Sequence, residues 1–135
     1  MRNDIPFIIG HRGAARHAPE NTLASIRRAA QLGAKWVEFD VKLSRDGVLM
    51  LFHDDTLART TDGAGRPEDL SFEQLGRLDA GSWFSPDFAG ERIPSLVEAI
   101  QLLIELGLGG NVEIKPAPGQ ARETALAVAD VLGAE

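Results

Sequence analysis

The stretch WVEFDVKL, residues 36–43, decides the fold, because from Val37 onward its apolar and polar residues alternate. Successive side chains of a β-strand point to opposite faces, so Val37 and Phe39 share one face while Glu38 and Asp40 share the other. We therefore predict a strand whose apolar face lies against a hydrophobic core. The two carboxylates allow two interpretations. They form a solvent-exposed face of hydrated charges, or they are partly buried and need a divalent cation to offset their repulsion.

The segments on either side of this strand alternate between predicted strands and predicted helices. Apolar runs indicate the strands, and capping residues followed by apolar residues at helical spacing indicate the helices. The predicted strands are Pro6–Gly10, Trp36–Leu43, Val48–Phe52 and Asn111–Lys115, and the predicted helices run over about 22–33, 96–107 and 120–132. This order is typical of a parallel α/β sheet, which gathers functional residues at the carboxyl ends of its strands.

Residues 56–94 interrupt this alternation. The segment is rich in Gly, Asp, Arg and Pro, and it contains one short predicted helix near 71–78. Excursions of this length are usually functional. Three of its aromatic residues, Trp83, Phe84 and Phe88, line the wall of a substrate pocket or form the small core of the excursion. We prefer the second interpretation.

Composition excludes several classes of function. The 135 residues suit one domain, and 44% hydrophobic with 25% charged residues is ordinary for a globular chain. A net charge of −6 without a run of Lys or Arg argues against nucleic-acid binding. No apolar stretch reaches the roughly 18 residues of a membrane span. The start, MRNDIPFIIG, lacks the features of an export signal, so we expect a cytoplasmic protein.

Two histidines follow apolar runs, His11 beside Arg12 and His53 beside Asp54. Imidazoles titrate near neutral pH and can share the roles of general base and general acid, while an arginine can bind a phosphate with two hydrogen bonds. A lone histidine is more often structural, and we give that interpretation to His17.

The segment Glu113-x-Lys115 repeats the alternating pattern on another short strand. A third carboxylate beside a lysine suits a metal site next to a phosphate. Taken alone, however, these residues are better explained by an ion pair on an edge strand.

Six short motifs follow one another in order and together resemble the glycerophosphodiester phosphodiesterase family over essentially the whole chain. They are His11-Arg12-Gly13, Pro19-Glu20-Asn21-Thr22, Glu38-Phe39-Asp40-Val41, His53-Asp54-Asp55, Asp79-Ala80-Gly81-Ser82 and Glu113-Ile114-Lys115-Pro116.

The resemblance implies a (β/α)₈ barrel that hydrolyses glycerophosphodiesters, as small-molecule substrates, to glycerol phosphate and an alcohol. It also implies that residues 56–94 are the insertion of this family, and that Glu20 lies near the site. The implied roles are a divalent cation, Mg²⁺ or Ca²⁺, bound by Glu38, Asp40 and Glu113; acid–base catalysis by His11 and His53; and phosphate binding by Arg12 and Lys115.

The length departs from this family pattern, because a closed barrel of this kind needs about 250 residues. We therefore expect residues 1–135 to form the N-terminal part of a barrel, with the insertion after the second strand region. Open sheet edges predict a homo-oligomer. Two alternatives remain for function: a related phospholipase-like phosphodiesterase, and a catalytically weak, self-associating part-barrel.

Overall fold

The structure, a computed structural model, describes residues 9–134. It contains four strands, four α-helices and two short 3₁₀ helices over these residues. In chain order they are β1 (Ile9–His11), α1 (Leu23–Gln31), β2 (Trp36–Leu43), β3 (Leu49–Leu51), η1 (Pro67–Asp69), α2 (Phe72–Leu75), η2 (Pro86–Phe88), α3 (Leu96–Leu106), β4 (Gly109–Ile114) and α4 (Ala121–Ala134). The first part of the predicted strand 6–10 lies outside the described residues.

Strand β2 is the centre of the sheet. β1 runs parallel to its first half, with Ile9 opposite Trp36, and β4 runs parallel along its other edge, with Asp40 opposite Glu113. β3 pairs with the end of β2, on the same edge as β1. The alternating stretch therefore pairs with each of the three remaining strands of the described sheet.

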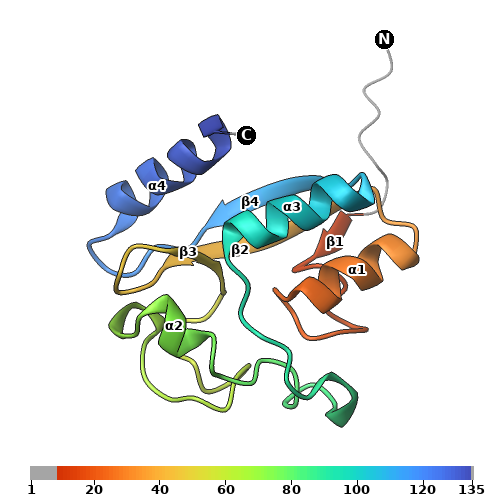
Figure 1. Ribbon diagram of the computed structural model, residues 1–135, viewed down its shortest axis with the longest axis horizontal. Coiled ribbons are helices and arrows are strands. Elements are labelled where there is room, and N and C mark those ends of the chain that lie inside the picture. Colours follow the sequence, from red (N-terminus) through yellow and green to blue (C-terminus); the bar gives the residue numbers. More distant parts are fainter. Residues whose placement is uncertain (1–8, 135) are drawn as a thin grey trace.

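The apolar face of β2 is buried, as its sequence predicts. Val37, Phe39 and Val41 are fully buried in a core to which α1 contributes Ile26 and α3 contributes Leu96. Figure 1 shows α1 and α3 along one side of the sheet, where they also contact each other. Both helices begin as predicted, α1 with the side chain of Thr22 as N-cap and α3 with a capping box from Ser95 and Glu98.

The prediction of an all-parallel sheet was wrong for β3, which is antiparallel to β2. Only residues 44–48 join the two strands, whereas a parallel connection needs a dozen or more. Gly47, with φ +80°, allows the tight turn that follows β2. The strands β1, β2 and β4 are thus the parallel part of the sheet.

Residues 56–94 fold around a second buried cluster, which they share with β3 and the residue after it. It consists of Met50, Phe52, Leu57, Leu75, Ala80 and Ile93. The interpretation of the three aromatic residues as this core was wrong. Trp83 and Phe84 make an edge-to-face contact, as do Phe84 and Phe88, but the group lies partly exposed outside the buried cluster.

The sheet is open on both sides. Within residues 9–134, no strand pairs with the outer edge of β1 or of β4. Two large apolar side chains at one end of the sheet are exposed, Ile9 of the edge strand β1 by 48% and Trp36 of the central strand β2 by 41%. No helix in the described range is both long and apolar enough to cross a membrane.

Candidate active site

Three carboxylates meet on the polar face of the sheet. Glu38 and Asp40 project from β2 because they are two residues apart, and Glu113 joins them from β4 because it is the register partner of Asp40. One oxygen of each lies within 4.8 Å of the others. Asp40 is buried, Glu38 is half-buried and Glu113 is exposed, so the cluster opens toward the outer edge of β4.

The surroundings of Glu38 leave its negative charge poorly compensated. Its Oε2 accepts a long hydrogen bond of 3.4 Å from the backbone N–H of Arg12 and lies 3.6 Å from Nε2 of His11. Its Oε1 is buried and has no hydrogen-bond partner among the described residues. Burial, followed by the charge of Asp40, raises the pKa of Glu38 to about 7. Such a group is well suited to bind a cation.

Glu113 differs from Glu38, because a cation of the protein already faces it. Nζ of Lys115 lies 2.8 Å from Oε1 of Glu113, and this contact lowers the pKa of Glu113 and raises the pKa of Lys115. The carbonyl oxygen of Lys115 accepts a hydrogen bond from the buried side chain of Lys42, which fixes the end of β4 against β2.

Asn21 holds Asp40 in place with two hydrogen bonds. Its Nδ2 donates to Oδ2 of Asp40 over 3.0 Å, and its Oδ1 accepts the backbone N–H of Asp40. The backbone N–H of Asn21 in turn donates to the carbonyl of Arg12. Both Asn21 and Arg12 have positive φ, +55° and +52°, which non-glycine residues rarely adopt. Unfavourable backbone geometry of this kind is typical of functional sites.

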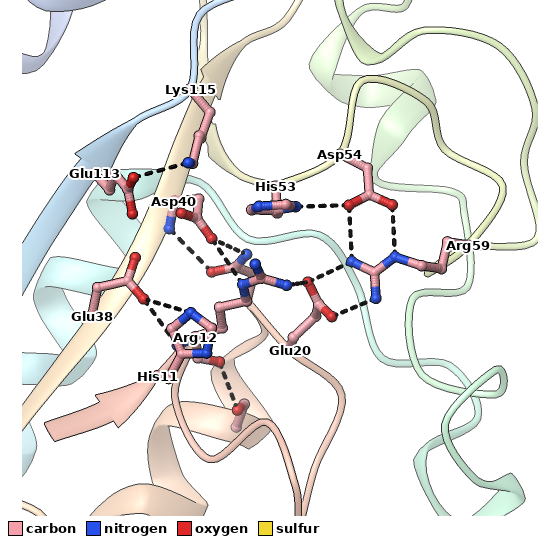
Figure 2. A network of polar contacts seen from close by, with 12 residues as sticks. His11, Arg12, Glu20, Glu38, Asp40, His53, Asp54, Arg59, Glu113 and Lys115 are labelled. Atoms are coloured by element: carbon pink, nitrogen blue, oxygen red, sulfur yellow. Dashed lines mark hydrogen bonds and ion pairs between the residues drawn. The ribbon is translucent and has the colours of Figure 1, made fainter. Parts of the chain in front are cut away.

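The opposite side of the site is a chain of ion pairs that links Arg12 to His53. Nη1 of Arg12 donates to Glu20, and the guanidinium of Arg59 binds both Glu20 and Asp54. Asp54 lies 2.7 Å from Nδ1 of His53. Figure 2 shows these side chains together, with Arg59 at the far end of the network from the three carboxylates.

The model of the glycerophosphoryl diester phosphodiesterase family matches residues 11–134. The chain belongs to this family.

Individual members of the family are similar over most of the chain. A glycerophosphodiester phosphodiesterase of Caldanaerobacter subterraneus is 46% identical over 109 residues, which are 81% of this chain and 45% of the relative. Glycerophosphodiester phosphodiesterase 1 of the mouse is 52% identical over 68% of this chain and 28% of its own length.

Solved structures of the family share the fold. An Oleispira antarctica phosphodiesterase, in complex with the product sn-glycerol-3-phosphate, is 49% identical with a TM-score of 0.92 over 95% of this chain and 52% of that chain. The family enzyme of Thermotoga maritima is 31% identical with a TM-score of 0.72 over 92% of this chain and 48% of that chain. The chain thus spans about half the length of these relatives, and its open sheet is part of a family barrel, as the sequence predicts.

The seven residues that the sequence predicts as a site lie on the same side of the sheet (Figure 2). Glu38, Asp40 and Glu113 form the carboxylate cluster, with His11 and Arg12 beside Glu38 and Lys115 beside Glu113. His53 joins through Asp54 and the arginine network. Their catalytic and ligand roles stay predictions.

Three further polar residues belong to the network and were not predicted as site residues. Asn21 was quoted as part of a family motif and given no role in the site; the cap of α1 is its neighbour Thr22. Asp54 had been quoted only as the neighbour of His53. Arg59 lies in the excursion, 39 residues from its partner Glu20, so no local pattern indicates the pair.

Proposed function

We propose that this chain carries the catalytic residues for metal-dependent hydrolysis of glycerophosphodiesters to glycerol phosphate and an alcohol. The observation that carries the proposal is the cluster of Glu38, Asp40 and Glu113 beside His11 and Arg12. Membership of the family and the product complex of the Oleispira phosphodiesterase support the substrate class.

The three carboxylates are the proposed ligands of a divalent cation, Mg²⁺ or Ca²⁺. Both ions prefer oxygen ligands, and all the donors here are carboxylate oxygens. The unpartnered Oε1 of Glu38 and the raised pKa of this group fit a site that is completed by a cation. When bound, the cation would supply positive charge close to the phosphate oxygens.

Arg12 and Lys115 are the proposed phosphate-binding residues. The Nε atom of Arg12 lies 3.5 Å from Oδ2 of Asp40, and Nζ of Lys115 lies 2.8 Å from Glu113. Both cations therefore border the carboxylate cluster. Positive groups fixed in this way stabilise the negative charge that builds up on non-bridging phosphate oxygens in the transition state.

His11 and His53 are the proposed acid–base pair. One histidine removes the proton from a glycerol hydroxyl of the substrate, and that oxygen attacks phosphorus. The other histidine donates a proton to the alcohol oxygen as its bond to phosphorus breaks, which leaves a cyclic phosphate. Water then opens the ring with the two roles exchanged.

We further propose that residues 1–135 act as a partial barrel domain, with residues 56–94 as its insertion. The open edges of β1 and β4, together with the exposed side chains of Ile9 and Trp36 at the start of β1 and β2, favour self-association into a homo-oligomer. The same openness leaves Glu113 exposed to water, which weakens charge stabilisation, so activity of this chain alone should be low. The second candidate function is therefore a catalytically weak, self-associating part-barrel. Cytoplasmic localisation stays a prediction.

The test is hydrolysis of glycerophosphocholine by the purified chain with Mg²⁺ or Ca²⁺, compared with lysophosphatidylcholine. We expect release of glycerol phosphate from the first substrate, and its loss with a chelator. Preference for the lysophospholipid would favour the phospholipase-like alternative. Absence of turnover with both substrates, in a chain that still binds the cation, would favour the weakly catalytic part-barrel.

A further inference from the structure

Arg59 makes an unusual set of contacts for a half-exposed side chain. Its Nε and Nη2 donate to the two oxygens of Asp54 over 2.7 and 2.9 Å, while Nη1 and Nη2 donate to the two oxygens of Glu20 over 2.8 and 3.0 Å. One guanidinium thus binds two carboxylates, each with paired hydrogen bonds. This geometry is available to arginine and not to lysine.

The first of these carboxylates determines the state of His53. The hydrogen bonds from Arg59 fix both oxygens of Asp54 in place and, with the hydrogen bond from His53, hold the pKa of Asp54 well below its ordinary value. An ionised carboxylate can only accept hydrogen bonds, so Nδ1 of His53, 2.7 Å from Oδ1 of Asp54, must carry the hydrogen. In a neutral imidazole this leaves Nε2 free to accept a proton.

The second carboxylate connects Arg59 to Arg12. Glu20 is nearly buried, with 8% of its side chain exposed, and its Oε2 accepts hydrogen bonds from both Arg12 and Arg59. Nη1 of Arg12 thereby fixes the guanidinium between Glu20 and Asp40. Without Arg59, Glu20 would lose two of its three side-chain hydrogen bonds and, with them, its fixed orientation.

We propose that Arg59 is a positioning residue that sets the proton position on His53 through Asp54 and the orientation of Arg12 through Glu20. The consequence of this positioning for catalysis rests on the proposed phosphodiesterase function. Arg59 lies at the start of residues 56–94, so this contact also makes the geometry of the site depend on the folded excursion.

A simpler role for Arg59 is to attach the excursion to the sheet. The two roles differ in what they predict for His53, because a purely structural contact does not select one imidazole tautomer. The chain has three histidines, so ¹⁵N-labelled histidine gives a spectrum with few signals. The ring nitrogen that carries hydrogen and the one that does not have separate ¹⁵N chemical shifts.

The experiment records this spectrum at about pH 8 for the full chain and its variants. In the parent we expect His53 to be the tautomer with hydrogen on Nδ1. Arg59→Ala should give a mixture of tautomers at His53 and leave His17 unchanged. Asp54→Ala should have the same effect on His53, since it removes the acceptor itself. Arg59→Lys, which keeps the charge, is the second variant in case Arg59→Ala does not fold. A lysine cannot make the paired hydrogen bonds, so this variant should keep the parent tautomer of His53 only in part.

Arg77→Ala is the matched control. Arg77 is another arginine of the excursion and forms an exposed ion pair with Glu73, apart from the network. It should leave the His53 signals unchanged. An unchanged His53 tautomer in folded Arg59→Ala or Arg59→Lys would overturn the proposal.

Turnover provides a separate readout. If the chain hydrolyses glycerophosphocholine, Arg59→Ala should lower kcat by about 10–100-fold, the range seen when the partner of a functional side chain is removed. Unchanged kcat would overturn the proposal. If the parent is inactive but its tautomer depends on Arg59, the weakly catalytic part-barrel is favoured while the positioning of His53 stands.

Discussion

The carboxylates on the two sides of the site have opposite surroundings. Glu20 and Asp54 each offer two oxygens to the guanidinium of Arg59, and the pKa of Asp54 lies below its ordinary value. Glu38 has a buried oxygen without a partner, and its pKa is raised to about 7. The protein therefore compensates the charge on the arginine side with its own residues. On the other side the charge remains available for a ligand.

The two sides carry one histidine each, so removal of either should disable the site. His11→Ala, next to Glu38, and His53→Ala, next to Asp54, should each lower turnover by about 10²–10⁴-fold in a closed barrel that carries these residues, because each removes one proton-transfer group. Release of glycerol phosphate measures this effect, and circular dichroism checks the fold. Near-parental turnover of either variant would show that the acid–base pair has been wrongly assigned.

Removal of one charge from the cluster of Glu38, Asp40 and Glu113 should weaken cation binding, because only this side of the site has charge that the protein leaves uncompensated. Asp40→Asn should weaken binding of Mg²⁺ or Ca²⁺ by about 10²-fold or more, since loss of outer partners alone costs 10–100-fold in metal sites. Isothermal titration calorimetry measures the affinity. Glu105→Gln, on the exposed part of α3, is the control and should bind as the parent does. Equal affinities of Asp40→Asn and the parent would contradict the proposed cation site.

The raised pKa of Glu38 predicts that both cation affinity and stability depend on pH through this one carboxylate. A cation displaces the proton from Glu38, so the apparent affinity should fall by up to about tenfold per pH unit as pH decreases below about 7. In the cation-free protein the pKa in the folded state exceeds the ordinary value of 4.5. Glu38 therefore contributes stability below pH 4.5 that is lost as pH rises through about 7.

Calorimetry and thermal unfolding between pH 5 and 8 test both statements. Glu38→Gln should remove this part of the pH dependence of unfolding. If the parent and Glu38→Gln have parallel stability profiles, the shifted group is not Glu38.

The smallest change is expected from the open edges of the sheet, one of which, that of β4, carries Glu113. Self-association through the edges of β1 or β4 should give a mass above 14.5 kDa in light scattering at micromolar concentration. Trp36→Lys should shift the chain toward the monomer, because it replaces an exposed aromatic side chain with a charge. A compact parent monomer that unfolds cooperatively would contradict the association.

The features that sequence analysis predicts correctly are mostly local. Alternation along residues 36–43 predicts both the buried face of β2 and the common face of Glu38 and Asp40. The capping box of Ser95 predicts the start of α3. These patterns work because the partners lie two to four residues apart, where backbone geometry alone determines whether they share a face.

The features that it misses depend on how separate segments pair with one another. Only five residues join β2 to β3, which is too few for a parallel connection, so the two strands are antiparallel. The alternation of strands and helices along the rest of the chain led to the parallel prediction instead. The contact between Arg59 and Glu20 spans 39 residues and an irregular excursion. No periodicity connects these two residues, so the arginine network becomes visible only when the chain is folded.

Strand β2 has one further consequence, for the kinds of genetic change that the chain can accept. Its buried side chains and its carboxylates alternate along the same eight residues, with β1 and β4 paired on either edge. Deletion of one codon at Trp36 or Val37 would leave the spacing of Glu38 and Asp40 intact. It would shift their register by one residue and turn the carboxylates into the hydrophobic core. A library of single-codon deletions should therefore find β2 intolerant throughout, including at its exposed Trp36, whereas the turn at Gly47 should accept changes in length more readily.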